Sequence, residues 1–385
     1  MASPRILFLA LALSAGCRAS SSPTPAVAQT SAYVVRLGSD TLAVEQFTRV
    51  GDRLEGVLVT RYPRAVVTRY LVTLSADGTP ALIESSSRLA DGGLTPARIR
   101  ATTVTYAGDS ALMQQMRDTL ITVRVPAPRA FPYINYSMAF VQLPIAAARA
   151  AGLDSVAYTI LPVGGRGTTP ITVIRRGGTR YDFMLGPYRY QVQTDGRGVV
   201  QEVDGRGTTQ HFIARRLNGV DVTGIASAWG QRELGLLSTR DTVIASIGPA
   251  SLWVDYGRPA ARGRAVFGAD GVLGDTLWRT GANAATQFRT DTPILIGGER
   301  VPAGTYTLWT LAVPGRYQLI INRQTGQWGT VYDPARDLAR VPLAAAVLPR
   351  VMERFTIVVE PTGDRAGTLR LRWDATELSV PISVP

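Results

Sequence analysis

The stretch VVTRYLVTLSADGTPALIESS, residues 66–86, shows the pattern that decides the fold. Polar and apolar residues alternate through Val66–Leu74, Ala76-Asp77-Gly78 interrupts the alternation, and Ala81–Ser86 resumes it. Alternation places every second side chain on one face of a strand, and an Asp-Gly pair favours a tight turn. The stretch therefore predicts an antiparallel β-hairpin with one apolar face.

The same pattern recurs on both sides of this hairpin, with further turn signals such as Gly38-Ser39-Asp40. A sheet of so many strands has to curl or close, and its concave face is a candidate site for an apolar ligand. One Ala-rich segment, from about Ala139 to Ala151, ends at Gly152 and predicts a helical insertion. We therefore expect residues 31–238 to form a large, curled antiparallel sheet with one helix.

Shorter strands and more closely spaced turns characterise the second part, residues 241–385. Turn signals such as Gly297-Gly298 and Pro302-Ala303-Gly304 recur there, many of them about 8 to 12 residues apart. Such spacing predicts a β-sandwich, with a short helix near Leu343–Val347. The whole chain is thus expected to be mainly β, in two domains.

The first sixteen residues, Met1–Gly16, have the three parts of a secretory signal. Arg5 gives a positive start, Ile6–Leu13 is an apolar run, and small residues follow. Cys17 comes next, and Leu-Ser-Ala-Gly-Cys resembles a bacterial lipobox. We expect cleavage before Cys17 and lipid on its sulfur, which makes the membrane a partner of the protein through a lipid anchor.

The alternative for Cys17 is an ordinary signal peptide that happens to contain a cysteine. It is the only cysteine of the chain, so it has no partner for an internal disulfide, and lipidation accounts for its presence. Residues 17–30 are rich in Ser, Pro, Ala and Thr and predict a flexible tether. Arg18 stands where Asp would indicate inner-membrane retention, which favours the outer membrane, facing the periplasm.

The composition gives a formal net charge of +12 and a sequence pI near 10.3. All 41 basic residues are arginines, and they are scattered through strand-like segments without forming a basic helix or stripe. This distribution, together with export, argues against a nucleic-acid partner. A basic surface still favours anionic lipids or polysaccharides.

Motifs for common catalytic chemistry are missing from the sequence. His211 is the only histidine, so the usual zinc and copper sites lack ligands, and no Gly-x-Ser-x-Gly elbow occurs. No dinucleotide or phosphate-loop fingerprint occurs either. We therefore assign no catalytic residue, no metal ligand and no cofactor, and the sequence favours a protein that is not an enzyme.

From Ser251 onward, the chain carries a series of motifs in a fixed order. They include Val254-Asp255-Tyr256-Gly257-Arg258-Pro259, Arg262-Gly263-Arg264, Trp278-Arg279-Thr280-Gly281-Ala282-Asn283, Val301-Pro302-Ala303-Gly304-Thr305-Tyr306, Gln327-Trp328-Gly329 and Leu371-Arg372-Trp373-Asp374. In these motifs the last third of the chain resembles an exported bacterial family, domain of unknown function 2911. Ala284 departs from the pattern, because the family often has an acid there. The resemblance implies an exported β-sandwich and no established activity.

The segment Trp278–Asn283 is the strongest candidate for a binding site. Trp, Arg and Asn together offer a stacking face, a forked donor and an amide, a mixture that suits carbohydrate or carboxylate recognition. The competing interpretation is a core tryptophan beside an arginine that satisfies buried carbonyls. The candidate ligand-binding residues are Asp255, Tyr256, Arg258, Arg264, Trp278, Arg279, Asn283, Trp328 and Trp373.

Three functions follow from these observations. The first is a non-catalytic envelope lipoprotein that binds a lipid or a saccharide-like ligand. The second is a carboxylate-based enzyme acting on envelope glycans, which needs two acids facing each other in a cleft. The third is a structural or assembly scaffold, for which a large exposed apolar patch would be evidence. No feature of the sequence favours one oligomeric state over another.

Overall fold

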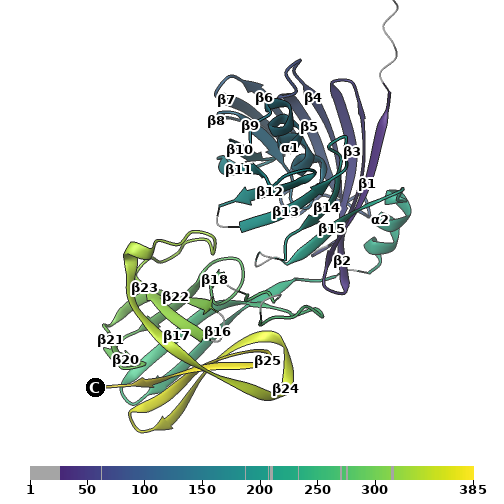
Figure 1. The fold of residues 1–385 in the computed structure, drawn as a ribbon. Coiled ribbons are helices and arrows are strands. Elements are labelled where there is room, and N and C mark those ends of the chain that lie inside the picture. Colours follow the sequence, from purple (N-terminus) through teal and green to yellow (C-terminus); the bar gives the residue numbers. More distant parts are fainter. Residues whose placement is uncertain are drawn as a thin grey trace, which may run out of the picture.

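The computed structural model describes residues 27–385 except residues 62, 187, 207, 209, 210, 233, 269, 270, 275, 314 and 315. The expected signal peptide, Cys17 and most of the expected tether lie outside the described residues. The described chain is mainly β and forms two bodies, a large curled sheet followed by a β-sandwich (Figure 1). The predicted fold class is therefore confirmed.

Fifteen strands of the described chain form the first sheet, in the order β8-β7-β6-β5-β4-β3-β2-β1-β15-β14-β13-β12-β11-β10-β9. All neighbours are antiparallel except β9 and β10. The bounds are β1 (Gln29–Leu37), β2 (Asp40–Val50), β3 (Arg53–Thr60), β4 (Val66–Leu74), β5 (Pro80–Leu89), β6 (Ala101–Ala107), β7 (Ser110–Met116), β8 (Leu120–Pro126), β9 (Ala130–Tyr133), β10 (Ser155–Pro162), β11 (Thr169–Arg175), β12 (Arg180–Leu185), β13 (Tyr188–Thr194), β14 (Val200–Asp204) and β15 (Phe212–Leu217).

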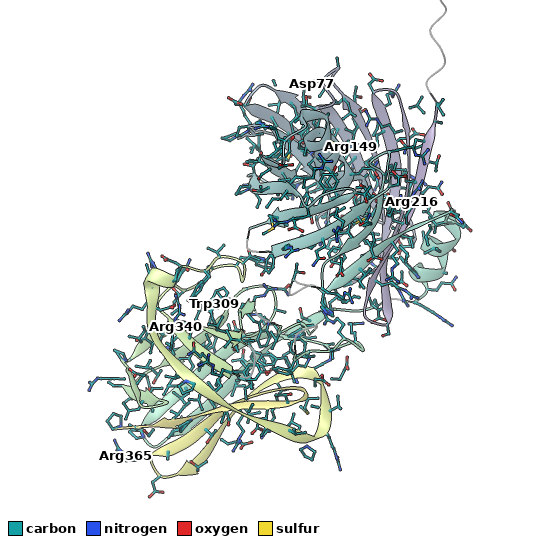
Figure 2. The ribbon with its side chains drawn as sticks, in the orientation of Figure 1. Asp77, Arg149, Arg216, Trp309, Arg340 and Arg365 are labelled. Atoms are coloured by element: carbon teal, nitrogen blue, oxygen red, sulfur yellow. The ribbon has the colours of Figure 1, made fainter. Side chains whose placement is uncertain are left out.

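The hairpin predicted within residues 66–86 is formed by β4 and β5. Its turn forms as expected, because the Asp77 carboxylate accepts hydrogen bonds from the Thr79 N–H at 2.9 Å and hydroxyl at 2.6 Å, and Gly78 has φ of 81°. Asp77 lies at the end of this domain that is remote from the sandwich (Figure 2). Local turn chemistry thus determines the register of the hairpin.

The sheet curls until its two edge strands approach each other. β8 and β9 are the two ends of the strand order, yet only residues 127–129 separate them along the chain. Four peptide steps span at most roughly 15 Å, so both edges have to lie on the same side of the domain. β8 and β9 do not pair with each other, which leaves the described sheet an open, strongly curled half-barrel.

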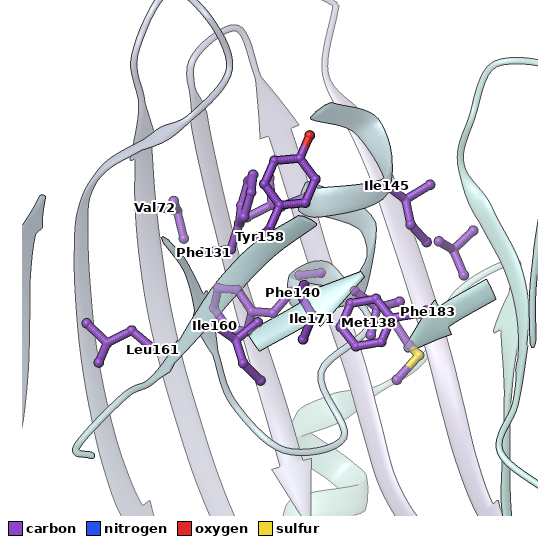
Figure 3. Packing of buried hydrophobic residues seen from close by; sticks show 14 of the residues in the cluster. Val72, Phe131, Met138, Phe140, Ile145, Tyr158, Ile160, Leu161, Ile171 and Phe183 are labelled. Carbon is purple, nitrogen blue, oxygen red and sulfur yellow. The ribbon is translucent and has the colours of Figure 1, made fainter. Parts of the chain in front are cut away.

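Helix α1 (Ala139–Ala151) fills the concave face of this sheet (Figure 1). It ends as predicted, because Gly152 adopts the left-handed conformation with φ of 68° and donates its N–H to the Arg149 carbonyl. Phe140 and Ile145 are buried among side chains of the sheet, and Phe140 lies 5.0 Å from the Tyr70 ring (Figure 3). Apolar side chains therefore occupy the space that the sequence suggested for a lipid.

A buried carboxylate from the sheet caps this helix. Glu45 of β2 has no exposed surface and accepts the N–H groups of Met138 at 2.6 Å and Ala139 at 3.3 Å. The same carboxylate accepts the hydroxyl of Tyr70 at 2.6 Å and that of Ser137. The first N–H groups of a helix lack partners within it, so Glu45 satisfies them and fastens α1 to the sheet.

The outer face of the sheet near β2 and β3 is covered by helix α2 (Val222–Gly230), which was not predicted from the sequence. Asp221 caps α2 by accepting the Gly224 N–H at 2.9 Å, and Ala226 packs with Val44 and Val59. β2 is therefore covered on both faces, which explains why its four consecutive residues Leu42–Glu45 are all buried.

Ten strands of the described chain build the second body. A short 3-10 helix (Pro334–Arg336) precedes its longest strand. The strands are β16 (Ser238–Ile247), β17 (Ala250–Pro259), β18 (Thr276–Trp278), β19 (Thr286–Thr290), β20 (Ile294–Ile296), β21 (Glu299–Val301), β22 (Gly304–Val313), β23 (Arg316–Asn322), β24 (Asp337–Gly363) and β25 (Ala366–Ser383).

Strand β24 belongs to both layers of this sandwich. Its first residues pair with β23, and the rest pair with β25, which continues to β20 and β21. The expected helix near Leu343–Val347 is wrong, because Leu343 pairs with Tyr317 of β23 and Ala344–Val347 pair with β25. Ala-rich sequence favours a helix locally, but pairing with two strands overrides that preference.

The two bodies meet where the turn between β1 and β2 touches the segment after β17. Ser39 donates its N–H at 3.1 Å and its hydroxyl at 3.2 Å to the Arg262 carbonyl. The Arg262 guanidinium lies 2.7 Å from Asp40, with side chains only 13% and 25% exposed. Gly38 also belongs to this contact, because a Cβ there would lie 2.1 Å from the Arg262 carbonyl oxygen. We call this contact, residues 38–40 on Arg262, the clasp.

Helices α1 and α2 are each too short to cross a bilayer, and no helix of the described residues is both long and apolar enough to do so.

Candidate functional site

A cavity of about 290 Å³ lies between the two bodies, beside the clasp. Six of the nine candidate ligand-binding residues line it: Arg264, Trp278, Arg279, Asn283, Trp328 and Trp373. The first body contributes Leu37, Asn135, Tyr136 and Tyr188. The structure thus brings residues from both bodies to one place.

The loop that carries Arg279 and Asn283 is shaped by three glycines. A Cβ on Gly257 would lie 2.2 Å from the Ala282 carbonyl oxygen, and one on Gly281 would lie 2.8 Å from the Thr286 hydroxyl. A Cβ on Gly329 would lie 1.8 Å from Cδ of Arg279. Each glycine permits a contact that no other residue allows, so these motif positions serve the packing of the loop.

Trp278 and Trp373 form the floor of the cavity and belong to the sandwich core. Their rings stack with centroids 5.5 Å apart, and only 2% and 1% of their surfaces are exposed. The Trp278 indole N–H donates to the Gly281 carbonyl at 2.8 Å. Trp328 differs, because 56% of its surface is exposed at the cavity. Trp328 is therefore the tryptophan best placed to stack on a ligand.

Two arginines of the cavity are held by main-chain carbonyls. Arg279 donates to the Gly329 carbonyl at 3.1 Å and to the Tyr188 hydroxyl at 3.2 Å. Arg264 donates to the carbonyls of Ala260 at 2.5 Å and Ala261 at 2.8 Å. Burial, and then the charge of the nearby Arg262, lowers the pKa of Arg264 to about 10, so it remains charged at neutral pH.

No carboxylate occurs among the described residues that line the cavity. Its polar groups include guanidinium groups, phenols and the amides of Asn135 and Asn283, and the Asn283 amide nitrogen lies 3.2 Å from the Ser238 hydroxyl. Such a set donates hydrogen bonds and attracts negative charge. It supplies no pair of acids for glycosidase chemistry.

The other three candidates lie away from the cavity and make structural contacts. Asp255 pairs with Arg240 at 2.5 Å, and the Tyr256 hydroxyl accepts the N–H of Ile357 at 3.0 Å. Arg258 pairs with Asp241 at 3.0 Å and also donates to two groups of β24. These three residues connect strands of the sandwich.

Sequence reasoning missed Asn135, Tyr136 and Tyr188. They come from the first body, and no motif linked them to the sandwich. Tyr136 has φ of 68°, an uncommon conformation for a residue other than glycine. The structure shows this conformation of Tyr136, but no sequence motif predicts it.

No group of three or more His, Cys, Asp or Glu side chains is arranged to hold a metal ion among the described residues. His211, the only histidine, lies just before β15 and lines a neighbouring cavity.

Residues 238–382 match the family described as protein of unknown function (DUF2911), the family that the motifs predicted. No curated protein matches the chain. Solved structures similar to it include a DUF1089 family protein from Pseudomonas aeruginosa, with 16% identity and a TM-score of 0.33 over 42% of this chain and 89% of that one. Another is a β-barrel-like protein of domain of unknown function DUF1849 from Brucella abortus, with 13% identity and a TM-score of 0.34 over 50% of this chain and 95% of that one.

Proposed function

We propose that this chain, whose last third is of the DUF2911 type, is an exported envelope lipoprotein that binds a saccharide-like ligand between its two bodies without transforming it. The observation that carries the proposal is the convergence of Trp328, Arg279 and Asn283 with Tyr136 and Tyr188 on one cavity. Aromatic faces and fixed donors in one concave site are the usual means of holding and orienting a polar ring.

The size of the cavity favours a small ligand or the end of a longer chain. Its volume of about 290 Å³ lies at the lower end of the range for ligand pockets. A lipid in the half-barrel is the less favoured ligand, because Phe140 and Ile145 of α1 fill that space. The cavity between the bodies is the better candidate for the binding site.

Binding is tested on a soluble form that begins at Arg18, with a glycan array followed by calorimetry of the ligands found. Trp328→Ala should weaken binding about five- to tenfold, since a stacking aromatic contributes about 1 to 1.4 kcal/mol. Ile244→Ala is the matched control, because Ile244 is 75% exposed on β16 and lies outside the cavity lining. No glycan bound, or equal affinities for both variants, would contradict the proposal.

The competing enzyme hypothesis has its own readout in the same experiment. Bound glycans recovered after long incubation should be intact if the protein only binds them. Shortened products would favour a carboxylate-based hydrolase instead, with acids outside the described lining.

The anchor is supported by the apolar run Ile6–Leu13 and the lipobox-like residues before Cys17. When cells that express the unaltered protein are grown with labelled fatty acid, the protein should carry the label and fractionate with membranes. Cys17→Ser should abolish the labelling and release the protein from membranes. A Cys17→Ser variant that remains membrane-bound would rule out the lipid anchor.

A further inference from the structure

A second cavity, of about 300 Å³, also has Arg264 in its lining. Strand β1 contributes Arg36, the segment around β15 contributes Arg206, His211 and Arg215, and the sandwich contributes Arg264. Arg264 lines both cavities, so they are neighbours that share this residue. We call this second space the basic cavity.

Four arginines line the basic cavity, and none of its described lining residues is an acid. Arg206 pairs with Asp204 at 2.6 Å, and Arg215 pairs with Glu202 at 2.8 Å. Both acids lie outside the lining, so they orient the two guanidinium groups without closing the space. Within the described residues, Arg36 is in no ion pair. The cluster therefore keeps an excess of positive charge.

Guanidinium groups in this arrangement suit an oxyanion. Their planar forks match carboxylate and phosphate oxygens, and charge-assisted hydrogen bonds are the stronger kind. The lowered pKa of Arg264 agrees with this, because burial and the charge of Arg262 already disfavour further positive charge there. An anion placed beside Arg264 would stabilise its positive charge, as the nearby Glu353 already does in part.

We propose that the ligand is an acidic saccharide, with a sugar ring in the first cavity and its carboxylate or phosphate among Arg36, Arg215 and Arg264 in the basic cavity. This inference rests on the proposed function, since it names the class of saccharide that the site takes. The observation that carries it is the shared Arg264 between an aromatic cavity and one lined by arginines without acids.

Calorimetry with three matched ligands tests the inference. Oligogalacturonate carries carboxylates, its methyl ester has the same rings without the charge, and a sugar phosphate supplies the other oxyanion. One of the two acidic ligands should bind at least about tenfold more tightly than the neutral ester, and the stronger one identifies the anionic group. Raising the ionic strength from roughly 0.01 M to roughly 1 M should weaken only the acidic ligand, because it shortens the Debye length from about 30 Å to about 3 Å.

Arg36→Ala should reduce the affinity for the acidic ligand about tenfold and leave that for the neutral ester unchanged. Arg36→Lys should recover part of the loss, because it restores the charge without the fork. Arg350→Ala is the matched control, since Arg350 is exposed on β24 and outside both cavities.

The possible failures are distinguishable. Equal binding of acidic and neutral ligands, with no effect of Arg36→Ala, would overturn the acidic class and leave saccharide binding intact. Binding of neither saccharide would overturn the proposed function and this inference together. Binding of inorganic phosphate in the absence of any saccharide binding would also overturn both.

Discussion

Gly257 illustrates how a single missing side chain shapes the site. It lies in β17, one residue from Arg258, and the Ala282 main chain packs directly on it. A Cβ at Gly257 would be 2.2 Å from the Ala282 oxygen and 2.8 Å from its nitrogen. Both are main-chain atoms, so no side-chain rotation relieves the overlap.

Gly257→Ala should therefore displace the loop that carries Arg279 and Asn283. We expect a loss of about 2 to 3 kcal/mol in the free energy of unfolding and weaker ligand binding. Urea denaturation measures the first effect and calorimetry the second. Gly167→Ala is the control, since a Cβ there meets nothing within 4 Å, and it should be neutral. Equal stability of the two variants would argue against the packing role.

Residues of the site were predictable only where they belong to the sequence motifs of the second body. Trp278, Arg279 and Asn283 belong to one motif, and their mixture of side chains indicated a binding site. Asp255 and Arg258 belong to an equally clear motif, yet they contact neighbouring strands. Strand register and the docking of the first body decide which side chains reach the cavity, and neither can be read from a motif.

Among the elements, α1 shows both the reach and the limit of sequence reasoning. Its bounds followed from the Ala-rich run and Gly152, which are local signals. Its cap did not, because Glu45 comes from β2, far away in the sequence.

The hydrogen bonds that Glu45 accepts should contribute strongly to the stability of the fold. Glu45→Ala leaves the donors of Tyr70, Ser137, Met138 and Ala139 without their acceptor, so we expect a loss of about 3 kcal/mol or more. Denaturation by urea measures this loss. Leu153→Ala is the control, because Leu153 follows α1 and is 58% exposed, and it should cost far less.

Burial raises the pKa of Glu45 above its ordinary 4.5, against the lowering effect of its hydrogen bonds. The folded protein then holds the proton more tightly than the unfolded chain. Stability linked to Glu45 is therefore complete below pH 4.5 and declines as the pH rises through the raised pKa. Glu45→Gln, which does not titrate, should lack this decline in unfolding experiments across the pH range. Parallel pH profiles for the two proteins would show that folding does not raise the pKa of Glu45.

At the scale of the whole molecule, the clasp holds the two bodies around the cavity. Asp40→Asn keeps the shape of the side chain and removes the charge that faces Arg262. Loss of a partly buried pair should destabilise the closed arrangement of the two bodies by about 1.4 kcal/mol. The ratio of closed to open molecules should then fall about tenfold. Limited proteolysis should cut residues 231–237, between the bodies, correspondingly faster.

Asp118→Asn provides the matched control for the clasp. Asp118 pairs with Arg100 at 3.7 Å, but the side chains are 72% and 49% exposed, so this pair should contribute little. The same proteolysis should proceed at the rate of the unaltered protein. If Asp40→Asn behaved like Asp118→Asn, the clasp would not control the contact between the bodies.

The strand order of the first sheet also has a consequence for how the chain folds. β1 lies between β2 and β15, and Ala32 pairs with Leu217. A chain that emerges with its N-terminus first exposes one edge of β1 until β15 has followed. Pairing between strands so far apart in the sequence is slow. Until it occurs, the unpaired edge of β1 can form hydrogen bonds with strands of other chains. Association with other chains is therefore most favourable at the free edge of β1, in the interval before β15 pairs with it.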